Sequence, residues 1–177
     1  MNASLAGPAD DASLRRLLRA MPMGSSVRVS FEREPSYFSA ARVQGDAQVP
    51  VVRGADGEVL GMGLRAFAPG FLGGQAVETA YLGDLRLRPQ HRGGTLLARG
   101  YRYLRELHRD GRASLYATMV VADNARALAA LSSARAGLPT YRDLGLYRSP
   151  AVVLGSSPLP PSIPGVMRGR NSTTVTS

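Results

Sequence analysis

The sequence contains no cysteine and no lysine, and it has only two histidines among its 177 residues. The absence of cysteine excludes disulfide bonds, thiolate catalysis and cysteine-ligated metal sites. The absence of lysine excludes a P-loop phosphate lysine, a Schiff base and a lysine general base. His91 and His108 lie far apart in the sequence without the spacing of metal ligands, so we expect no metal.

Long apolar runs are also missing from the sequence. No stretch approaches the roughly 20 apolar residues that span a bilayer, and the first residues lack a secretory signal pattern. Hydrophobic residues make up 44% of the chain, which is enough to fill one core of good size. We therefore expect a soluble, cytoplasmic protein with a single domain.

All 22 basic residues are arginine, and the formal net charge is +9. Such an excess can indicate a nucleic-acid partner. The arginines are spread along the chain, however, with few aromatic residues among them and no run of four or more. The pattern favours a compositional bias, and we expect neither nucleic acid nor a membrane as a partner.

The pattern of apolar and turn residues predicts a domain with both helices and strands. Apolar residues at helical spacing and cap signals predict helices over residues 13–21, about 35–41, 95–109 and 125–132. Alternating or β-branched segments predict strands over residues 27–31, 48–52, 59–67, 77–87, 114–121, 141–147 and 151–154. Turn residues at 56–57 and 69–74 join three of these strands into an antiparallel meander.

The fold class predicted from this order is α/β (α+β), with a mixed, mostly antiparallel central sheet and flanking helices. A helix separates strand 77–87 from strand 114–121, so these two strands are expected to pair in parallel. The folded domain is expected over residues 10–154. Residues 155–177 are rich in proline, serine and threonine without periodicity, and they are expected to form a disordered tail or linker.

The most informative motif is Leu85-Arg-Leu-Arg-Pro-Gln-His-Arg-Gly-Gly, which joins strand 77–87 to helix 95–109. Amides in the first turn of a helix lack intrahelical partners and favour a bound anion. Gly93 and Gly94 would let a ligand approach the main chain, and Arg92 adds a positive charge. The same pattern occurs in tight strand-to-helix connections, so the motif alone leaves a phosphate site and a structural turn open.

This motif and a second one, Asp123-Asn124-Ala-Arg-Ala127, occur in an order of elements that resembles the GNAT superfamily of N-acetyltransferases over residues 27–154. The resemblance implies a V-shaped split between the two parallel strands, which holds the pantetheine arm of acetyl-CoA as co-substrate. It implies that backbone groups of Leu85 and Leu87 contact that arm. It further implies that the pyrophosphate lies against Arg92, Gly93, Gly94, Thr95 and Leu96.

Acetyl transfer to an amine needs a base, a group that stabilises the oxyanion, and close alignment of the reacting atoms. Asp84 and Glu78 are the candidate bases, and for each the alternative is an ordinary pairing with an arginine. Many relatives carry a proton-donating tyrosine at the position of Leu131. Tyr141 is a candidate to replace that acid, as are the weaker acids Ser132 and Ser133.

Asn124 has two interpretations, as a cofactor contact or as the cap of the helix that follows it. Thr95 and Leu97 stand where relatives carry small residues, which distinguishes the loop of this chain from the usual pattern. The role of Asn124 and the size of Thr95 and Leu97 both affect which contacts the chain can make with the cofactor.

Two hypotheses of different classes follow. The first is an acetyl-CoA-dependent N-acetyltransferase that passes the acetyl group directly to a primary amine of a small molecule or a protein. The second is a non-catalytic CoA- or ligand-binding module of the same fold, as one half of a tandem arrangement. The resemblance also implies that a homodimer through the last strands is compatible with the fold.

Overall fold

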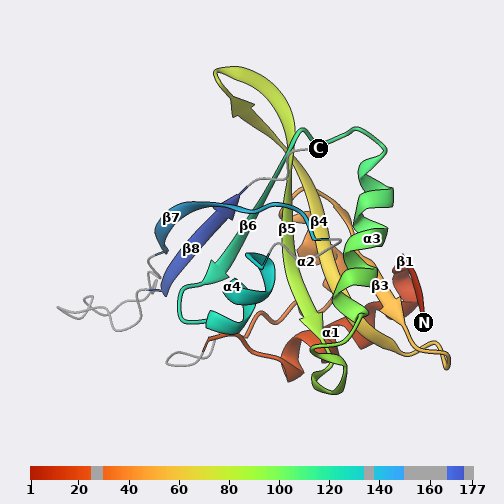
Figure 1. Ribbon diagram of the computed structural model, residues 1–177. Coiled ribbons are helices and arrows are strands. Elements are labelled where there is room, and N and C mark those ends of the chain that lie inside the picture. The colour runs from red at the N-terminus through yellow and green to blue at the C-terminus, as the bar shows by residue number, and fades with distance from the viewer. Residues whose placement is uncertain (25–29, 134–137, 150–166, 174–177) are drawn as a thin grey trace, which may run out of the picture.

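One sheet with helices on both of its faces forms the domain (Figure 1). The computed structural model describes residues 1–24, 30–133, 138–149 and 167–173. The strands in these residues are β1 (Asn2–Leu5), β2 (Asp46–Gln48), β3 (Pro50–Arg53), β4 (Val59–Leu72), β5 (Gln75–Leu87), β6 (Leu115–Val121), β7 (Arg142–Ser149) and β8 (Met167–Thr173). The helices are α1 (Asp11–Ala20), α2 (Tyr37–Arg42), α3 (Leu96–His108) and α4 (Ala125–Leu131), with short 3-10 turns at η1 (Pro8–Asp10) and η2 (Pro89–His91).

The strands described lie in the order β1-β3-β4-β5-β6-β8-β7, and β2 pairs with the far half of β4. Each neighbouring pair is antiparallel except β5 and β6, which run parallel. The predicted meander β3-β4-β5 and the predicted parallel pair are confirmed. The α/β fold class with a mostly antiparallel sheet is therefore confirmed as well.

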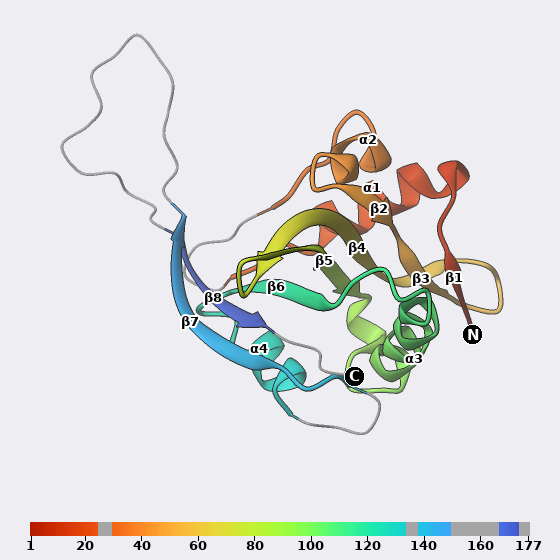
Figure 2. The same cartoon turned by 90° about the horizontal axis from the view of Figure 1, so that it is seen from above.

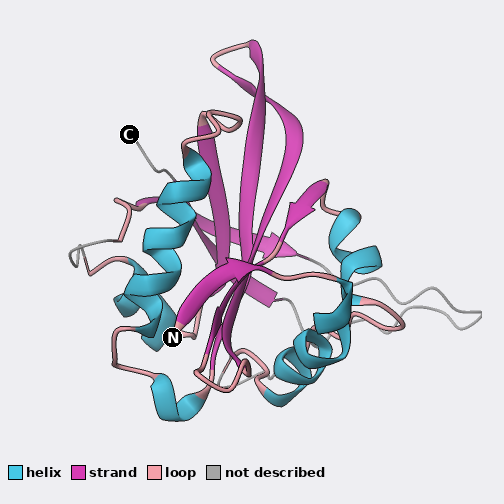
Figure 3. Cartoon of the chain, turned by 90° about the vertical axis from the view of Figure 1, so that its right-hand side faces the viewer, coloured by secondary structure: helices cyan, strands magenta, loops and turns pink. Residues whose placement is uncertain are grey.

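The helices divide between the two faces of the sheet. Figures 2 and 3 show α1 and α2 on one face, and Figure 2 shows α3 and α4 on the other. The face under α1 and α2 holds the larger core cluster, in which Leu14, Leu17 and Leu18 of α1 meet Met62 and Leu64 of β4. Burial of each such side chain contributes about 2 kcal/mol, so the predicted amphipathic stripe of α1 explains its docking.

The start of α2 is fixed by an acid of α1. Asp11, the first residue of α1, accepts hydrogen bonds from the Ser36 hydroxyl at 2.9 Å and the Tyr37 amide at 2.8 Å. Ser36 itself caps α2 by accepting from the amide of Ser39. The helix therefore begins at Tyr37, two residues later than the proline that was expected to open it.

Arg65 of β4 is a fully buried charge on the opposite face of the sheet, with its side chain 0% exposed. Its guanidinium makes two hydrogen bonds to the carboxylate of Asp110, at 2.7 and 2.9 Å. It also donates to the Tyr116 hydroxyl at 2.6 and 3.1 Å, to Gln48 and to the carbonyl of Leu107. Every nitrogen of this guanidinium is thus paired, which is what burial of an arginine requires.

Two predicted boundaries differ in the structure. The second hairpin turn is only Gly73 and Gly74, because β4 continues through residues 69–72 that were expected to be loop. Residues 167–173 form β8, although they were expected to belong to the disordered tail. β8 pairs with both β6 and β7. The pattern of its side chains, which are mostly polar, does not predict a strand in the middle of these two.

The predicted strand over residues 27–31 falls mainly on residues 25–29, which lie outside the described residues. Phe31, at its end, has no regular secondary structure. The predicted strand over residues 151–154 also lies outside the described residues. Among the helices that are described, none combines the length and the apolar character needed to cross a membrane.

Replacement of Asp110 by alanine should lower the free energy of unfolding by about 3 kcal/mol, because it leaves the buried charge of Arg65 without its carboxylate. The hydrogen bonds from Arg65 lower the pKa of Asp110 in the folded protein. Stability gained from a lowered carboxyl pKa is present above the unfolded value of about 4 and is lost as the pH falls through the folded value.

Urea denaturation of the wild type and Asp110→Ala at pH 7 and below pH 4 measures this effect. The difference between the two proteins should shrink as the pH falls. Glu106→Ala is the matched control, because Glu106 is an exposed carboxylate in the last turn of α3, the helix that Asp110 follows. Its loss should change stability by less than about 0.5 kcal/mol. An equal effect of both substitutions would contradict the role given to Arg65.

Candidate functional site

β5 and β6 are paired over three residues and then separate. The parallel register joins Thr79 to Leu115, Ala80 to Tyr116 and Tyr81 to Ala117. Beyond these pairs the Thr118 hydroxyl still donates to the carbonyl of Leu82 at 2.7 Å, and then the two strands diverge (Figure 1). The last residues of β5 therefore pair with β4 on one edge and face the split on the other.

A β-bulge lies where β5 enters the split. Met62 of β4 pairs with Arg86, and Leu64 pairs with Gly83, so Asp84 and Leu85 together stand opposite one residue of β4. Asp84 has φ 50°, and among the described residues it is the one non-glycine residue with positive φ. Aspartate tolerates this left-handed conformation better than most residues, and a bulge changes the direction in which a side chain points.

The carboxylate of Asp84 is buried and paired. Nε of Arg33 donates to Oδ2 at 2.8 Å, and Nη2 forms an ion pair with the same oxygen, also at 2.8 Å. Both side chains are less than one-tenth exposed. The hydroxyl of Tyr37 donates to the same oxygen at 2.9 Å. Burial and the charge of Asp84 raise the pKa of Tyr37 well above its ordinary value, so this phenol remains a donor at neutral pH.

Glu78, the other candidate base, lies on the far side of the paired segment from the split. Its carboxylate accepts hydrogen bonds from Arg112 at 3.1 and 3.2 Å, and Arg112 also binds Asp46 and lies 3.8 Å from the ring centre of Phe67. Six residues of strand separate Glu78 from Asp84, which corresponds to roughly 20 Å. The structure therefore does not bring the two candidate bases together.

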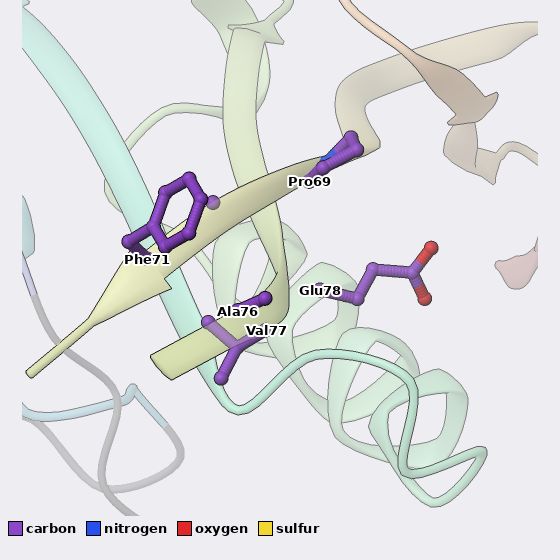
Figure 4. Close-up of a pocket in the computed structure, with 6 residues that line it drawn as sticks. Pro69, Phe71, Ala76, Val77 and Glu78 are labelled. Carbon is purple, nitrogen blue, oxygen red and sulfur yellow. The ribbon is translucent and has the colours of Figure 1, made fainter. Parts of the chain in front are cut away.

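Glu78 instead lines an open hollow of about 310 Å³ at the base of the projecting β4–β5 hairpin. Figure 4 shows the side chains that line it, with Glu78 towards one end and Phe71 towards the other. The remaining lining residues are Pro69, Gly70, Ala76 and Val77. This hollow is remote from the glycine loop.

The glycine loop lies directly at the end of β5. Gly93 has φ +83°, and a side chain at this position would meet no other atom within 4 Å, so the space beside the loop is open. Arg92 is exposed, and its Nε donates to the carbonyl of Leu87 at 3.3 Å. The first turn of α3 begins after Thr95, whose side chain makes no cap hydrogen bond. The loop thus presents glycine backbone, a cation and an uncapped helix start.

The leucines of the predicted cofactor site differ in their surroundings. The Leu96 side chain is 2% exposed and packs with Val52 and Leu60, so only its backbone can face a ligand. Leu87 packs against this cluster, whereas the side chain of Leu85 remains 39% exposed beside the bulge. Sequence alternation alone does not separate these environments.

Asn124 caps α4, since its side chain accepts a hydrogen bond from the amide of Ala127 at 3.2 Å. Tyr141 lies against α3, where its hydroxyl is 2.6 Å from the hydroxyl of Tyr101. Burial raises the pKa of both phenols, which keeps them protonated at neutral pH. Leu131, at the position of the tyrosine of many relatives, is 7% exposed.

Three residues beside the split, Arg33, Tyr37 and Arg86, are not among the candidates that the sequence predicts. An arginine between Leu85 and Leu87 is typical of a strand position that faces solvent. Arg86 is buried because it lies on the face of the sheet that α1 and α2 cover, where Tyr37 begins α2. The sequence does not show that α1 and α2 cover this face of the sheet, so it does not predict the burial of Arg86.

Comparison with solved structures identifies the fold. The chain is similar to ribosomal-protein-alanine N-acetyltransferase from Brucella melitensis, with a TM-score of 0.65 and 15% identity over 99% of this chain and 100% of that one. It is similar to yncA from Salmonella typhimurium, whose structure holds its cofactor acetyl-CoA, with a TM-score of 0.64 and 15% identity over 99% and 93% of the two chains. Naa20 from Chaetomium thermophilum, in complex with a bisubstrate analogue, gives 0.67 and 12% over 99% and 86%.

The chain therefore has the fold of the GNAT N-acetyltransferases, as the sequence motifs predict, along nearly its whole length. In one such neighbour this fold binds acetyl-CoA. No family model and no curated protein sequence matches the chain.

Replacement of Asp84 by asparagine should lower the free energy of unfolding by about 3–5 kcal/mol, because it leaves the buried Arg33 without its counter-charge. Glu78→Gln is the matched control on the same strand. Its carboxylate is 42% exposed, and loss of that ion pair should cost less than about 1 kcal/mol. Urea denaturation at pH 7 measures both, and similar losses in the two variants would contradict the difference in their environments.

Proposed function

We propose that this protein is an acetyl-CoA-dependent N-acetyltransferase that transfers the acetyl group directly to a primary amine of a small molecule or a protein. The observation that carries the proposal is the split between β5 and β6, with the bulge at its mouth and the glycine loop at its end. This arrangement offers an extended ligand an unpaired strand edge followed by an anion site.

The edge of β5 would hold the acyl-pantetheine arm. The backbone of Leu85 and Leu87 lies on that edge, since the other edge of β5 is paired with β4. An extended amide chain can hydrogen-bond to such an edge as an added strand does. A backbone N–H beside the bulge would then point at the thioester carbonyl and stabilise the oxyanion that forms there.

The loop and the start of α3 would hold the pyrophosphate. The helix is 13 residues long and has an uncapped first turn, so its free amides and dipole favour an anion. Gly93 and Gly94 expose the main chain, and Arg92 supplies a charge without lysine. The amides of Thr95 and Leu96 would complete this set, while Asn124 acts on the fold as the cap of α4.

Bound acetyl-CoA supplies an activated thioester, and the chain supplies the proton transfers. The amine must lose a proton before its nitrogen bonds to the acetyl carbon and the carbon–sulfur bond breaks. Asp84 is the carboxylate beside the split, and the hydrogen bonds described to it end on Oδ2, which leaves Oδ1 to accept that proton. The Tyr141–Tyr101 pair remains protonated and would return a proton to the thiolate.

A second candidate function is binding of CoA without catalysis. It is favoured by Leu131, a buried hydrocarbon side chain at the position where many relatives carry the acid. A binding module of this kind would take up acetyl-CoA but release no free CoA in the presence of amines. The two candidates therefore differ in turnover and agree in cofactor binding.

Gly93→Val should weaken acetyl-CoA binding by about tenfold or more, because a β-branched residue strains the positive φ and covers the approach to the loop. Isothermal titration calorimetry with acetyl-CoA measures the change. Gly74→Val is the matched control, with φ +81° in the remote hairpin turn and equally open surroundings. Arg92→Glu should also weaken binding, and wild-type affinity in both loop variants would overturn the assignment of the anion site.

Tyr141→Phe should lower kcat on the order of 10²-fold, with little change in KM for acetyl-CoA, because it removes the acid and leaves the cofactor contacts intact. Release of free CoA with a panel of primary amines measures turnover. Tyr103→Phe is the matched control, since Tyr103 lies on α3, as does Tyr101, and makes no hydrogen bond through its side chain among the described residues. Unchanged kcat in Tyr141→Phe would remove Tyr141 from the reaction.

A further inference from the structure

Arg86 is a buried arginine whose hydrogen-bonding capacity is largely unused. The residue is 7% exposed, and its Nη1 donates to the carbonyl of the neighbouring Leu85 at 3.0 Å. Nε and Nη2 are shielded from solvent, and neither has a hydrogen-bond partner in the part of the chain that the structure describes. Unsatisfied buried donors on a charged group are rare in proteins and call for an explanation.

The charges around Arg86 do not balance. In the part of the chain that the structure describes, Arg33 and Asp84 are the charged side chains that act on it, and Tyr37 and Tyr81 face it as neutral phenols. The hydrogen bonds described to this carboxylate come from Arg33 and Tyr37, and none comes from Arg86. Two guanidinium groups thus share one carboxylate, and the cluster carries one excess positive charge beneath α2.

Arg65 shows how the same fold treats an arginine that serves structure. Each of its three nitrogens donates to a partner, and Asp110 balances its charge. Arg86 lacks both kinds of compensation, so its burial destabilises the ligand-free protein. Residues that reduce stability in this way are characteristic of binding and catalytic sites.

The unused donors have the geometry that a carboxylate needs. Nε and Nη2 lie along one edge of the planar guanidinium, and their N–H bonds point the same way, which permits two parallel hydrogen bonds to one carboxylate. Arg86 directly follows the bulge at the mouth of the split and lies between the two leucines whose backbone is proposed to hold the acyl arm. An anion bound to this edge would lie near the reacting acyl group.

We infer that Arg86 binds a carboxylate of the acceptor, and that the acceptor is therefore an amine that also carries a carboxylate, as an amino acid does. The inference rests on the proposed acetyl transfer and adds the chemical class of the acceptor. Nε and Nη2 are shielded from solvent in the ligand-free protein, so the inference requires the Arg86 side chain to turn towards the split when the carboxylate binds. One carboxylate neutralises the excess charge of the cluster.

The first test uses ligand-free protein and needs no turnover. Arg86→Met keeps the length of the side chain and removes the charge, so it should raise the Tm. Sodium propionate at millimolar concentrations should raise the Tm of the wild type and leave that of Arg86→Met unchanged, relative to sodium chloride at equal ionic strength. Sodium phosphate in a parallel series separates a carboxylate site from a site for any anion.

Arg88→Met is the matched control, because Arg88 lies two residues further along, at the end of β5, and is paired with Glu58 and the carbonyl of Val59. It should lower the Tm slightly and keep the propionate response. A lower Tm in Arg86→Met, or an equal propionate response in wild type and Arg86→Met, would overturn the inference. So would a phosphate response as large as that to propionate.

The second test measures release of free CoA with the standard amino acids and their carboxamides. The wild type should prefer each accepted acid over its amide by at least tenfold in kcat/KM, and Arg86→Met should lose that preference. The affinity for acetyl-CoA, measured by calorimetry, should be equal in both proteins. Failure of the wild type to bind acetyl-CoA would count against the proposed function, whereas normal binding without a preference for acids would count against the role of Arg86 alone.

Discussion

The ion cluster at Arg65 connects β4, β6 and the segment after α3 at the near end of the split. Arg65 lies on β4, and its side chain donates to the hydroxyl of Tyr116 on β6, on the other side of β5. β4 and β6 are two strand spacings apart, or about 10 Å. Its pairing with Asp110 fixes the segment that follows α3 to the same point. One buried charge thus holds β6 against β5 at the near end of the split and positions the helix whose other end meets the glycine loop.

The parts of this fold that the sequence predicts are those with short-range signals. The periodicity of α3, the Asp56-Gly57 turn and the cap at Asn124 are local, and the structure contains each of them. β8 gives no such signal, because its polar residues resemble a loop until β6 and β7 flank them. The pairing of Asp84 with Arg33 was likewise hidden, since 51 residues separate the partners.

The burial of two arginines is the feature of the structure that the sequence predicts least well. Arg65 and Arg86 each stand between apolar neighbours in a strand, and alternation alone places both on a solvent face. The helices on both faces of the sheet reverse that expectation. Of the candidate bases, Asp84 and Glu78 look equivalent in sequence, yet one lies at the split and the other pairs with Arg112 on the hairpin side.

The position of β8 between β6 and β7 also has a kinetic consequence. β8 pairs with β6 residues that lie roughly 50 positions earlier in the chain, and the nearest pair with β7, Ser149 and Met167, is also not a local contact. Docking of β8 must therefore close long stretches of chain. The β4–β5 hairpin, by contrast, closes over a two-residue turn. Folding should therefore begin around this hairpin and α3, and the half of the sheet on the β6 side should reach its native strand order last.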